Sequence, residues 1–320
     1  MTIAPGSASW LAILLAPALV FAEARAEAPA PNVIAAGGAP AKLSAVVPAD
    51  DVRRAIVLGT SGEVYEPDGN GAWVHRLPSR TAQPVVAAGR AGASIVALSE
   101  RRLFRLAANG WSAIRLAQRG TPILGTGRRA LAAVGRQLFA LDSLTKGEPT
   151  RLVAAPGNII AIGAGATAIV IATEAGAWKL GGAGGRLVPL PAASRPMRLV
   201  GDRWALVDRG AVDLTTGKLT AWPSGLAIGV AAATADDALA AIGAGSAGLE
   251  LVTLRRGTLT RDPLGISGVA VGVVVDRARR AMVALADGRL ALRQPAGWST
   301  IDVTDEPAAV HRGAPPAISN

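Results

Sequence analysis

The sequence predicts an all-β fold, a seven-bladed β-propeller of four-stranded antiparallel blades, because similar units of short strands follow one another along most of the chain. Each unit holds three or four apolar runs that are separated by turns rich in Gly, Asp, Asn or Arg. The residues that close the last run of each unit lie 32 to 42 positions apart, at Leu77, Leu116, Val153, Leu190, Trp222, Leu264 and Val303. A unit of this size cannot bury its own apolar face and has to stack on its neighbours. Seven such units, between residues 41 and 306, are enough to close a ring.

The second unit shows the expected order of strands and turns most clearly. Its apolar runs cover residues 94–98, 103–106 and 111–116, with turns at residues 100–102 and 109–110. The seventh unit repeats this order with runs at residues 282–285, 290–292 and 298–303. Short runs joined by tight turns are typical of antiparallel hairpins. We therefore expect these runs to form the outer three strands of a blade.

A further apolar run precedes each hairpin and is expected to be the innermost strand. These runs lie at residues 42–47, 84–88, 122–125, 158–162, 197–200, 225–231 and 268–275. Their residues are small and continuously apolar instead of alternating with polar ones, which is typical of strands packed on both faces. Each blade would thus place its smallest residues next to the central axis.

The composition supports one all-β body at residues 41–306 without a second domain. Half of the chain is apolar, yet it contains only three Phe and one Tyr, so the core has to be built from Ala, Val, Leu, Ile and closely approaching Gly. Most of the 38 glycines fall at the expected turns, where positive φ or close backbone approach is needed.

The N-terminus is typical of a secretory signal peptide covering residues 1–26. An apolar run of 13 residues, 10–22, precedes Ala24-Arg25-Ala26, whose small residues suit cleavage after Ala26, although residues 1–10 carry no Lys or Arg. The run is shorter than the roughly 20 residues that a spanning helix needs, and the chain has no cysteine to acylate. We therefore expect a periplasmic or secreted protein with no transmembrane anchor in the mature chain. Residues 27–40 are expected to form a disordered Ala/Pro/Gly linker and residues 307–320 a C-terminal tail.

The formal net charge of +10 leaves two interpretations open. The excess is nearly all Arg, which would attract an acidic protein, a polysaccharide or lipid head groups. Alternatively, the arginines form a solvated exterior without a specific partner. Nucleic acid is not expected as a partner, because the protein is expected to be exported and no aromatic stacking strip accompanies the arginines.

Two short patterns resemble known propeller repeats. Residues 211–222, AVDLTTGKLTAW, resemble the repeat of quinoprotein-type (PQQ-like) propellers, and residues 138–147 are a looser version. The resemblance implies a turn and packing role for these residues and no cofactor ligand. Residues 68–73, DGNGAW, resemble the Asp-box turn of sialidase-like propellers, but the Ser or Thr that opens the box is missing. We expect Trp73, Trp111 and Trp298 to begin outer strands and to pack between blades.

The sequence predicts no catalytic residue, no cofactor and no metal site. The only histidines are His75, in an expected outer strand, and His311, in the tail. The innermost runs contain no Asp or Glu, and Asp202 and Asp276 follow the ends of two of them. A nucleophile with its base, or a set of hard-cation ligands, therefore has no obvious place near the axis.

We therefore expect a non-catalytic exported propeller that acts as a scaffold or recognition module for a protein, glycan or other anionic ligand. The alternative is a propeller enzyme of lactonase, lyase or quinoprotein type. In either case the protein would be a monomer or a subunit of a complex.

The candidate ligand-binding residues are Arg102, Arg136 and Arg209, because Arg forks bind anionic groups bidentately. They fall in turns between second and third strands, which share one rim of the ring with the turns that lead into the next blade. The opposite rim is the competing position, with arginines at Arg53, Arg54, Arg128, Arg129, Arg203, Arg279 and Arg280.

Overall fold

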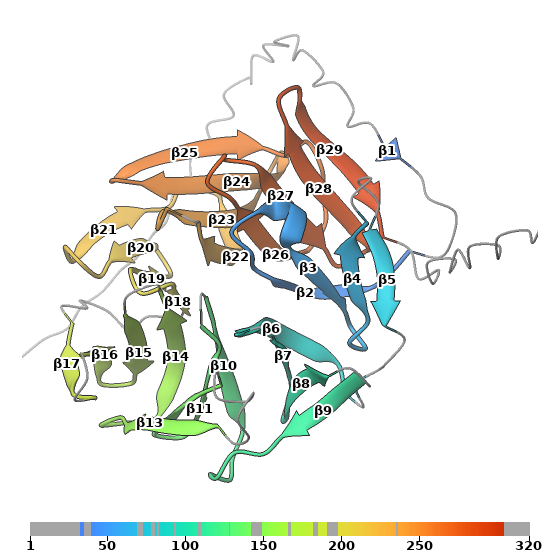
Figure 1. Cartoon of the computed structure of the whole chain (residues 1–320). Helices are drawn as coiled ribbons and strands as arrows, with labels where there is room; N and C mark the ends of the chain where they lie inside the picture. Colours follow the sequence, from blue (N-terminus) through green and yellow to red (C-terminus); the bar gives the residue numbers. More distant parts are fainter. Residues whose placement is uncertain are drawn as a thin grey trace, which may run out of the picture. The chain divides into compact units, whose positions relative to one another are not determined.

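The computed structural model describes residues 33–34, 40–68, 73–77, 81, 83–92, 94–107, 110–127, 129–141, 149–165, 168–181, 185–190, 198–234 and 236–303. The expected signal peptide and C-terminal tail lie outside these residues. The described part is a seven-bladed propeller of four-stranded antiparallel blades, as the sequence predicts (Figure 1). Its one helical element is the short 3-10 turn η1 (Val52–Arg54). Within the described residues, no helix has the length and hydrophobicity needed to cross a membrane.

In each of blades 1 to 4, the four strands follow one another along the chain from the innermost to the outermost. Blade 1 is β2 (Leu43–Val47), β3 (Ile56–Gly59), β4 (Val64–Pro67) and β5 (Trp73–Leu77). Blade 2 is β6 (Val85–Ala91), β7 (Ser94–Ser99), β8 (Leu103–Ala107) and β9 (Gly110–Ile114). Blade 3 is β10 (Pro122–Gly127), β11 (Leu131–Val134), β12 (Gln137–Ala140) and β13 (Thr150–Ala154). Blade 4 is β14 (Ile159–Ala164), β15 (Ile169–Thr173), β16 (Gly176–Leu180) and β17 (Leu187–Pro189).

Blades 5 to 7 repeat the same order. Blade 5 is β18 (Arg198–Val200), β19 (Trp204–Val207), β20 (Gly210–Asp213) and β21 (Lys218–Ala221). Blade 6 is β22 (Ala227–Ala233), β23 (Leu239–Gly245), β24 (Gly248–Arg255) and β25 (Thr258–Pro263). Blade 7 is β26 (Ala270–Val275), β27 (Ala281–Leu285), β28 (Arg289–Gln294) and β29 (Gly297–Asp302). The seven inner strands overlap the seven runs expected from the sequence, and they surround the axis (Figure 1).

The core lies between the blades. Each of the seven interfaces has its own cluster of buried side chains drawn from the two blades that meet there. Between blades 1 and 2, for example, Leu58 packs with Val85 and Ala97. Large aromatic side chains are rare in these clusters, so the sheets approach closely and no blade has a core of its own.

Glycine allows the closest of these approaches. A Cβ on Gly163 would collide with the carbonyl oxygen of Gly201 in the next blade, and a Cβ on Gly125 would collide with Ile162. The ends of β10 and β14 come near enough to pair in parallel, with Thr126 opposite Gly163. Small residues at the axis are thus what lets seven blades fit around it.

The sequence alone does not indicate how the ring closes, and the structure shows several contacts between its ends. Residues 33–34 lie within the expected linker and form β1 (Val33–Ile34), which pairs in parallel with the outer strand β29 of blade 7. The backbone N–H of Ala41 donates to the carbonyl of Val303 at 2.8 Å. One core cluster joins Tyr65 of blade 1 to Met282 of blade 7. The first and last described segments therefore meet in blade 7 and at its interface with blade 1.

Candidate functional site

Six arginines of the described region are held in ion pairs with carboxylates. The pairs are Arg203–Asp213, Arg255–Asp236, Arg261–Glu250, Arg280–Asp276 with Arg280–Asp51, Arg289–Asp287 and Arg293–Asp262. A guanidinium that already forks onto a carboxylate has few donors left for a ligand. These six arginines are therefore structural, and the binding sites have to be sought among the others.

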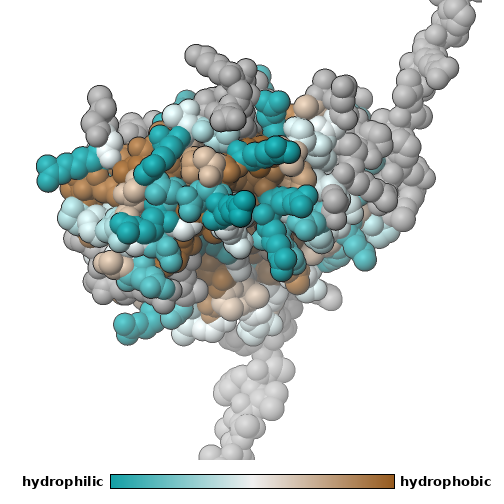
Figure 2. Space-filling view, turned by 90° about the horizontal axis from the view of Figure 1, so that it is seen from below, coloured by the Kyte–Doolittle hydropathy of each residue, from teal (hydrophilic) through white to brown (hydrophobic). Residues whose placement is uncertain are grey.

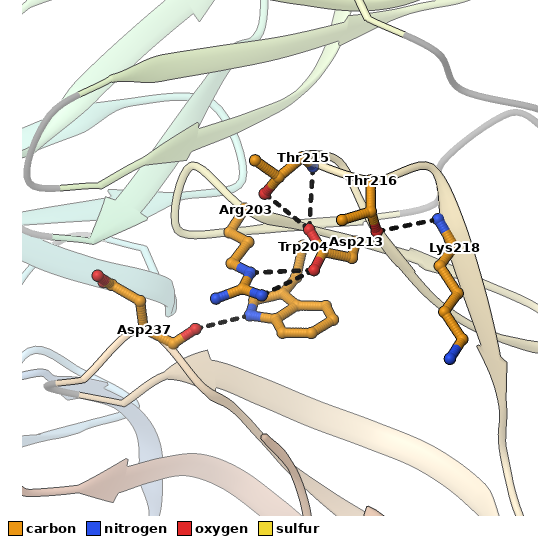
Figure 3. A network of polar contacts seen from close by, with 7 residues as sticks. All are labelled: Arg203, Trp204, Asp213, Thr215, Thr216, Lys218 and Asp237. Atoms are coloured by element: carbon orange, nitrogen blue, oxygen red, sulfur yellow. Dashed lines mark hydrogen bonds and ion pairs between the residues drawn. The ribbon is translucent and has the colours of Figure 1, made fainter. Parts of the chain in front are cut away.

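The pair in blade 5 shows why the quinoprotein-like pattern is structural (Figure 3). Arg203 donates from Nε and Nη2 to one oxygen of Asp213, at 3.2 and 2.8 Å, while the backbone N–H and hydroxyl of Thr215 donate to the other oxygen. Burial opposes the charge of Asp213, but the hydrogen bonds from Arg203 and Thr215 outweigh it and lower the pKa. The indole N–H of Trp204 donates to the backbone carbonyl of Asp237 in blade 6 at 3.0 Å. The network thus fixes a turn and joins two blades.

The outer tryptophans have the packing role expected of them. Trp111 in β9 donates its indole N–H to the carbonyl of Gly62 in blade 1 at 2.7 Å. Trp73 belongs to the cluster between blades 7 and 1, and Trp298 packs on the cluster between blades 6 and 7. All three stand at or next to the start of a fourth strand.

A group of unpaired arginines lies on the rim of blades 2 and 3, and we call it the basic rim. It consists of Arg101 and Arg102 in the β7–β8 turn, Arg119 in the β9–β10 connection and Arg136 in the β11–β12 turn. All four are exposed, and none forms an ion pair within the part of the chain that the structure describes. Glu100 is the acidic residue among them. Three positive charges therefore remain in excess.

Backbone packing brings two segments of the basic rim together, and local hydrogen bonds fix its turns. Gly120, next to Arg119, approaches so closely that a Cβ would lie 2.7 Å from the side chain of Val134 at the start of the β11–β12 turn. Arg136 in that turn donates from Nε to the carbonyl of Ala155 at 2.8 Å, so its guanidinium is partly positioned. The hydroxyl of Ser99 donates to the carbonyl of Arg102 at 3.2 Å and fixes the other turn.

Two of the three predicted site residues lie in adjacent blades. Arg102 and Arg136 share the basic rim, while Arg209 lies in the β19–β20 turn of blade 5, with blade 4 between. All three occupy turns between second and third strands, as expected, and all three are exposed. On the same rim in blade 7, Arg289 donates to Asp287 at 2.6 Å and is neutralised.

A second candidate site is the central cavity, which has a volume of about 1160 Å³. Its described lining comes from the inner strands and from turns between first and second strands, so its mouth lies on the rim opposite to the basic rim. Arg102, Arg136 and Arg209 are not in that lining. The ionisable groups that are in it are Asp50, Asp51, Arg54, Arg90, Arg198, Asp237 and Arg277.

The arginines that the sequence places on this second rim have different surroundings. Of the arginines named there, Arg54 lines the cavity, Arg203 and Arg280 are held in ion pairs, and Arg128 lies outside the described residues. Arg90, Arg198 and Arg277 line the cavity but were missed. Each stands at or within two residues of an end of an inner strand, so treating both strand ends as part of the lining would have found them.

The carboxylates and histidines do not gather. Within the described residues there is no group of three or more His, Asp and Glu side chains that could hold a metal ion. Asp202 and Asp276 lie in the β18–β19 and β26–β27 turns, on the rim where the sequence places them. His75 lies in the outer strand β5, with its ring centroid 5.3 Å from that of Tyr65, while His311 is outside the described region.

Figure 2 shows one face of the molecule, on which hydrophilic side chains are spread over the surface with apolar areas between them. Hydropathy by itself therefore defines no site on that face. The basic rim and the cavity mouth are instead the places where the described arginines without a carboxylate partner lie.

Comparison with known proteins supports the fold. No family model matches the chain, and no curated protein matches it. Among solved structures, YCF48 from Cyanidioschyzon merolae is similar, with 18% identity, a TM-score of 0.54 and coverage of 79% of this chain and 95% of that one. YCF48 bound to D1 peptide has 16% identity, a TM-score of 0.54 and coverage of 87% and 96%. A streptogramin B lyase has 14% identity, a TM-score of 0.56 and coverage of 78% and 92%. These similarities show a shared propeller fold.

Proposed function

We propose that this protein is an exported, non-catalytic propeller that recognises an acidic segment of a partner protein on its basic rim. The observation that carries the proposal is the contrast between two sets of arginines. Six are each neutralised by a carboxylate, whereas the four of the basic rim are exposed and have none in the described region. A guanidinium group without an ion-pair partner in its own chain is available to bind a carboxylate of another molecule.

The solved structures make this use of the fold reasonable. A propeller of similar architecture, YCF48, has been solved with a peptide bound. The lyase similarity concerns the fold, and none of the observations on this chain favours the alternative of a lactonase, lyase or quinoprotein enzyme over recognition. In this proposal the protein works as a monomer or as a subunit of a complex with its partner.

A labelled Glu-rich peptide tests the basic rim directly. We expect the protein to bind it in low salt, and the double variant Arg102→Glu/Arg136→Glu to bind it at least about tenfold more weakly, because each reversal replaces attraction by repulsion. The matched control is Arg151→Glu/Arg186→Glu, which makes the same charge change at exposed residues of β13 and of the segment before β17. Fluorescence anisotropy at two salt concentrations measures both effects.

The native partner provides the second test. Cross-linking in the periplasm or medium, followed by quantitative mass spectrometry, should recover one protein with the original chain and with the control variant, and lose it with the rim variant. Equal recovery with all three would show that the basic rim is not the binding surface. Loss with the control variant alone would move the site to the outer strands of blades 3 and 4.

Export is the remaining part of the proposal. The apolar run before Ala24-Arg25-Ala26 supports cleavage after Ala26. The intact mass of the protein isolated from its own cells should correspond to a chain that begins at Glu27. A mass that includes Met1 or Thr2 would contradict it.

A further inference from the structure

The wall of the central cavity is aliphatic and exposed to the lumen. It includes Val86, Ile123, Ile160, Val230 and Val271. Val86 keeps 53% of its surface exposed, and the other four are half-buried. An apolar surface enclosed by a polar rim is typical of a ligand-binding site. The volume of about 1160 Å³ exceeds the range of roughly 300–1,000 Å³ that is usual for small-molecule pockets, so a long aliphatic chain has room.

Arginines without a carboxylate partner stand where this wall meets solvent. Arg277, Arg54 and Arg90 come from the consecutive blades 7, 1 and 2, and none forms an ion pair within the described region. Arg90 donates from Nη2 to the backbone carbonyl of Arg54 at 3.2 Å, which leaves its other donors available. The three side chains therefore offer donors to an anion at one side of the mouth.

The aspartates of the lining do not cancel this group. Asp51 already accepts from Arg280 at 2.9 Å and from the backbone N–H of Arg53 at 2.8 Å. Asp237 belongs to the β22–β23 turn of blade 6, which adjoins blade 7 and Arg277 but not blades 1 and 2. Asp50 is the one carboxylate of blade 1 that remains free among the described residues. One free carboxylate beside three arginines leaves an excess of positive charge at this side of the mouth.

We propose that the cavity binds an amphipathic organic anion, a carboxylate carried on a long aliphatic chain. The chain lies along the inner-strand wall, and the carboxylate lies among Arg54, Arg90 and Arg277. This site is separate from the basic rim, since the two occupy opposite rims, and it does not depend on the proposed recognition of a partner protein.

Three probes with the same tail and different heads test the proposal on the unmodified protein. Isothermal titration calorimetry compares decanoate, decanol and decyltrimethylammonium, each below its micellar concentration. We expect decanoate to bind tightest and decyltrimethylammonium weakest. Shortening decanoate to octanoate should weaken binding by up to about threefold to fourfold per CH₂, the fold-change that corresponds to ~0.8 kcal/mol.

Variants then locate the head and the tail. Arg54→Gln/Arg277→Gln should weaken decanoate about tenfold or more and leave decanol unchanged, because only the charge-assisted bonds are lost. The matched control Arg151→Gln/Arg186→Gln, at exposed residues of β13 and of the segment before β17, should bind both as before. Val86→Asp, at an exposed lumen position, should weaken the binding of both decanoate and decanol, with thermal melting confirming the fold.

The proposal is wrong if decanoate binds no better than the cationic probe, or if Arg54→Gln/Arg277→Gln leaves the binding of decanoate unchanged. Equal affinity for octanoate and decanoate would also overturn it, because the chain would then lie outside the cavity.

Discussion

Arg280 in the last blade donates from Nη2 to Oδ1 of Asp51 in the first blade at 2.9 Å, and these residues are 229 positions apart. The same guanidinium donates from Nε to Asp276 at 2.7 Å. The backbone N–H of Arg53 and the charge of Arg280 lower the pKa of Asp51. Arg280 therefore ties the turn of one terminal blade to that of the other, at the mouth of the cavity.

Replacing Arg280 by Met should lower the free energy of unfolding by about 2–3 kcal/mol, because Asp276 is only 2% exposed and would lose its charged partner. Urea denaturation measures the change. The control Arg255→Met removes an exposed pair with Asp236 and should cost at most ~1 kcal/mol. Equal effects of the two substitutions would show that ring closure does not depend on Arg280.

Replacing Gly163 by Ala should destabilise the ring by at least ~2 kcal/mol, because the new Cβ would meet the backbone carbonyl of Gly201, which cannot rotate away. Gly229 is the matched control. It also lies in an inner strand, but a Cβ there would be 3.9 Å from its nearest neighbour, the carbonyl of Ile242. Thermal melts of both variants should therefore differ clearly. Similar melting temperatures would contradict the close approach of β14 to blade 5.

Stability should fall in acid. The pKa values of Asp51, Asp213, Glu250 and Asp287 are lowered below their ordinary values of 3.8 for Asp and 4.5 for Glu. As the pH falls, the unfolded chain therefore takes up protons before the folded one. The stabilisation by these carboxylates is complete above their ordinary pKa values and is lost as the pH falls through their lowered pKa values in the folded protein. Urea denaturation between about pH 5 and pH 3 should show this loss. In the Asp213→Asn variant, the free energy of unfolding should fall less steeply with decreasing pH. An unchanged slope would remove Asp213 from the acid response.

Deleting residues 277–306 should unfold the whole propeller and not only its last blade. The deletion removes β27, β28 and β29, and with them the partners of Tyr65 and Ala41 in the closing interface. Circular dichroism during heating should show no cooperative transition. A cooperative β-sheet transition in the shortened chain would mean that six blades are stable without closure.

The architecture could be predicted from the sequence because each repeat carries its own signals. The Asn, Asp and Gly turns set the strand ends, and the continuous small residues mark the inner strands. The close approach at Gly125 and Gly163 is shown by the structure. The sites were harder to predict. The position of an arginine in a turn shows on which rim it lies, but it does not show whether a carboxylate pairs with it. Nothing local in the sequence shows that Arg289 is neutralised whereas Arg102 is exposed and unpaired. Nor does it show that Arg280 reaches Asp51.

The glycines between inner strands set the diameter of the ring, because they decide how near neighbouring sheets come to the axis. The side chains that face the lumen, such as Val86 and Ile160, set what can enter it. Gly125 and Gly163 do not line the cavity, whereas Val86 and Ile160 do. The chemistry of the cavity can therefore change by substitution of the lumen residues while the number of blades stays at seven, and a change at the glycines would alter the width without altering the wall.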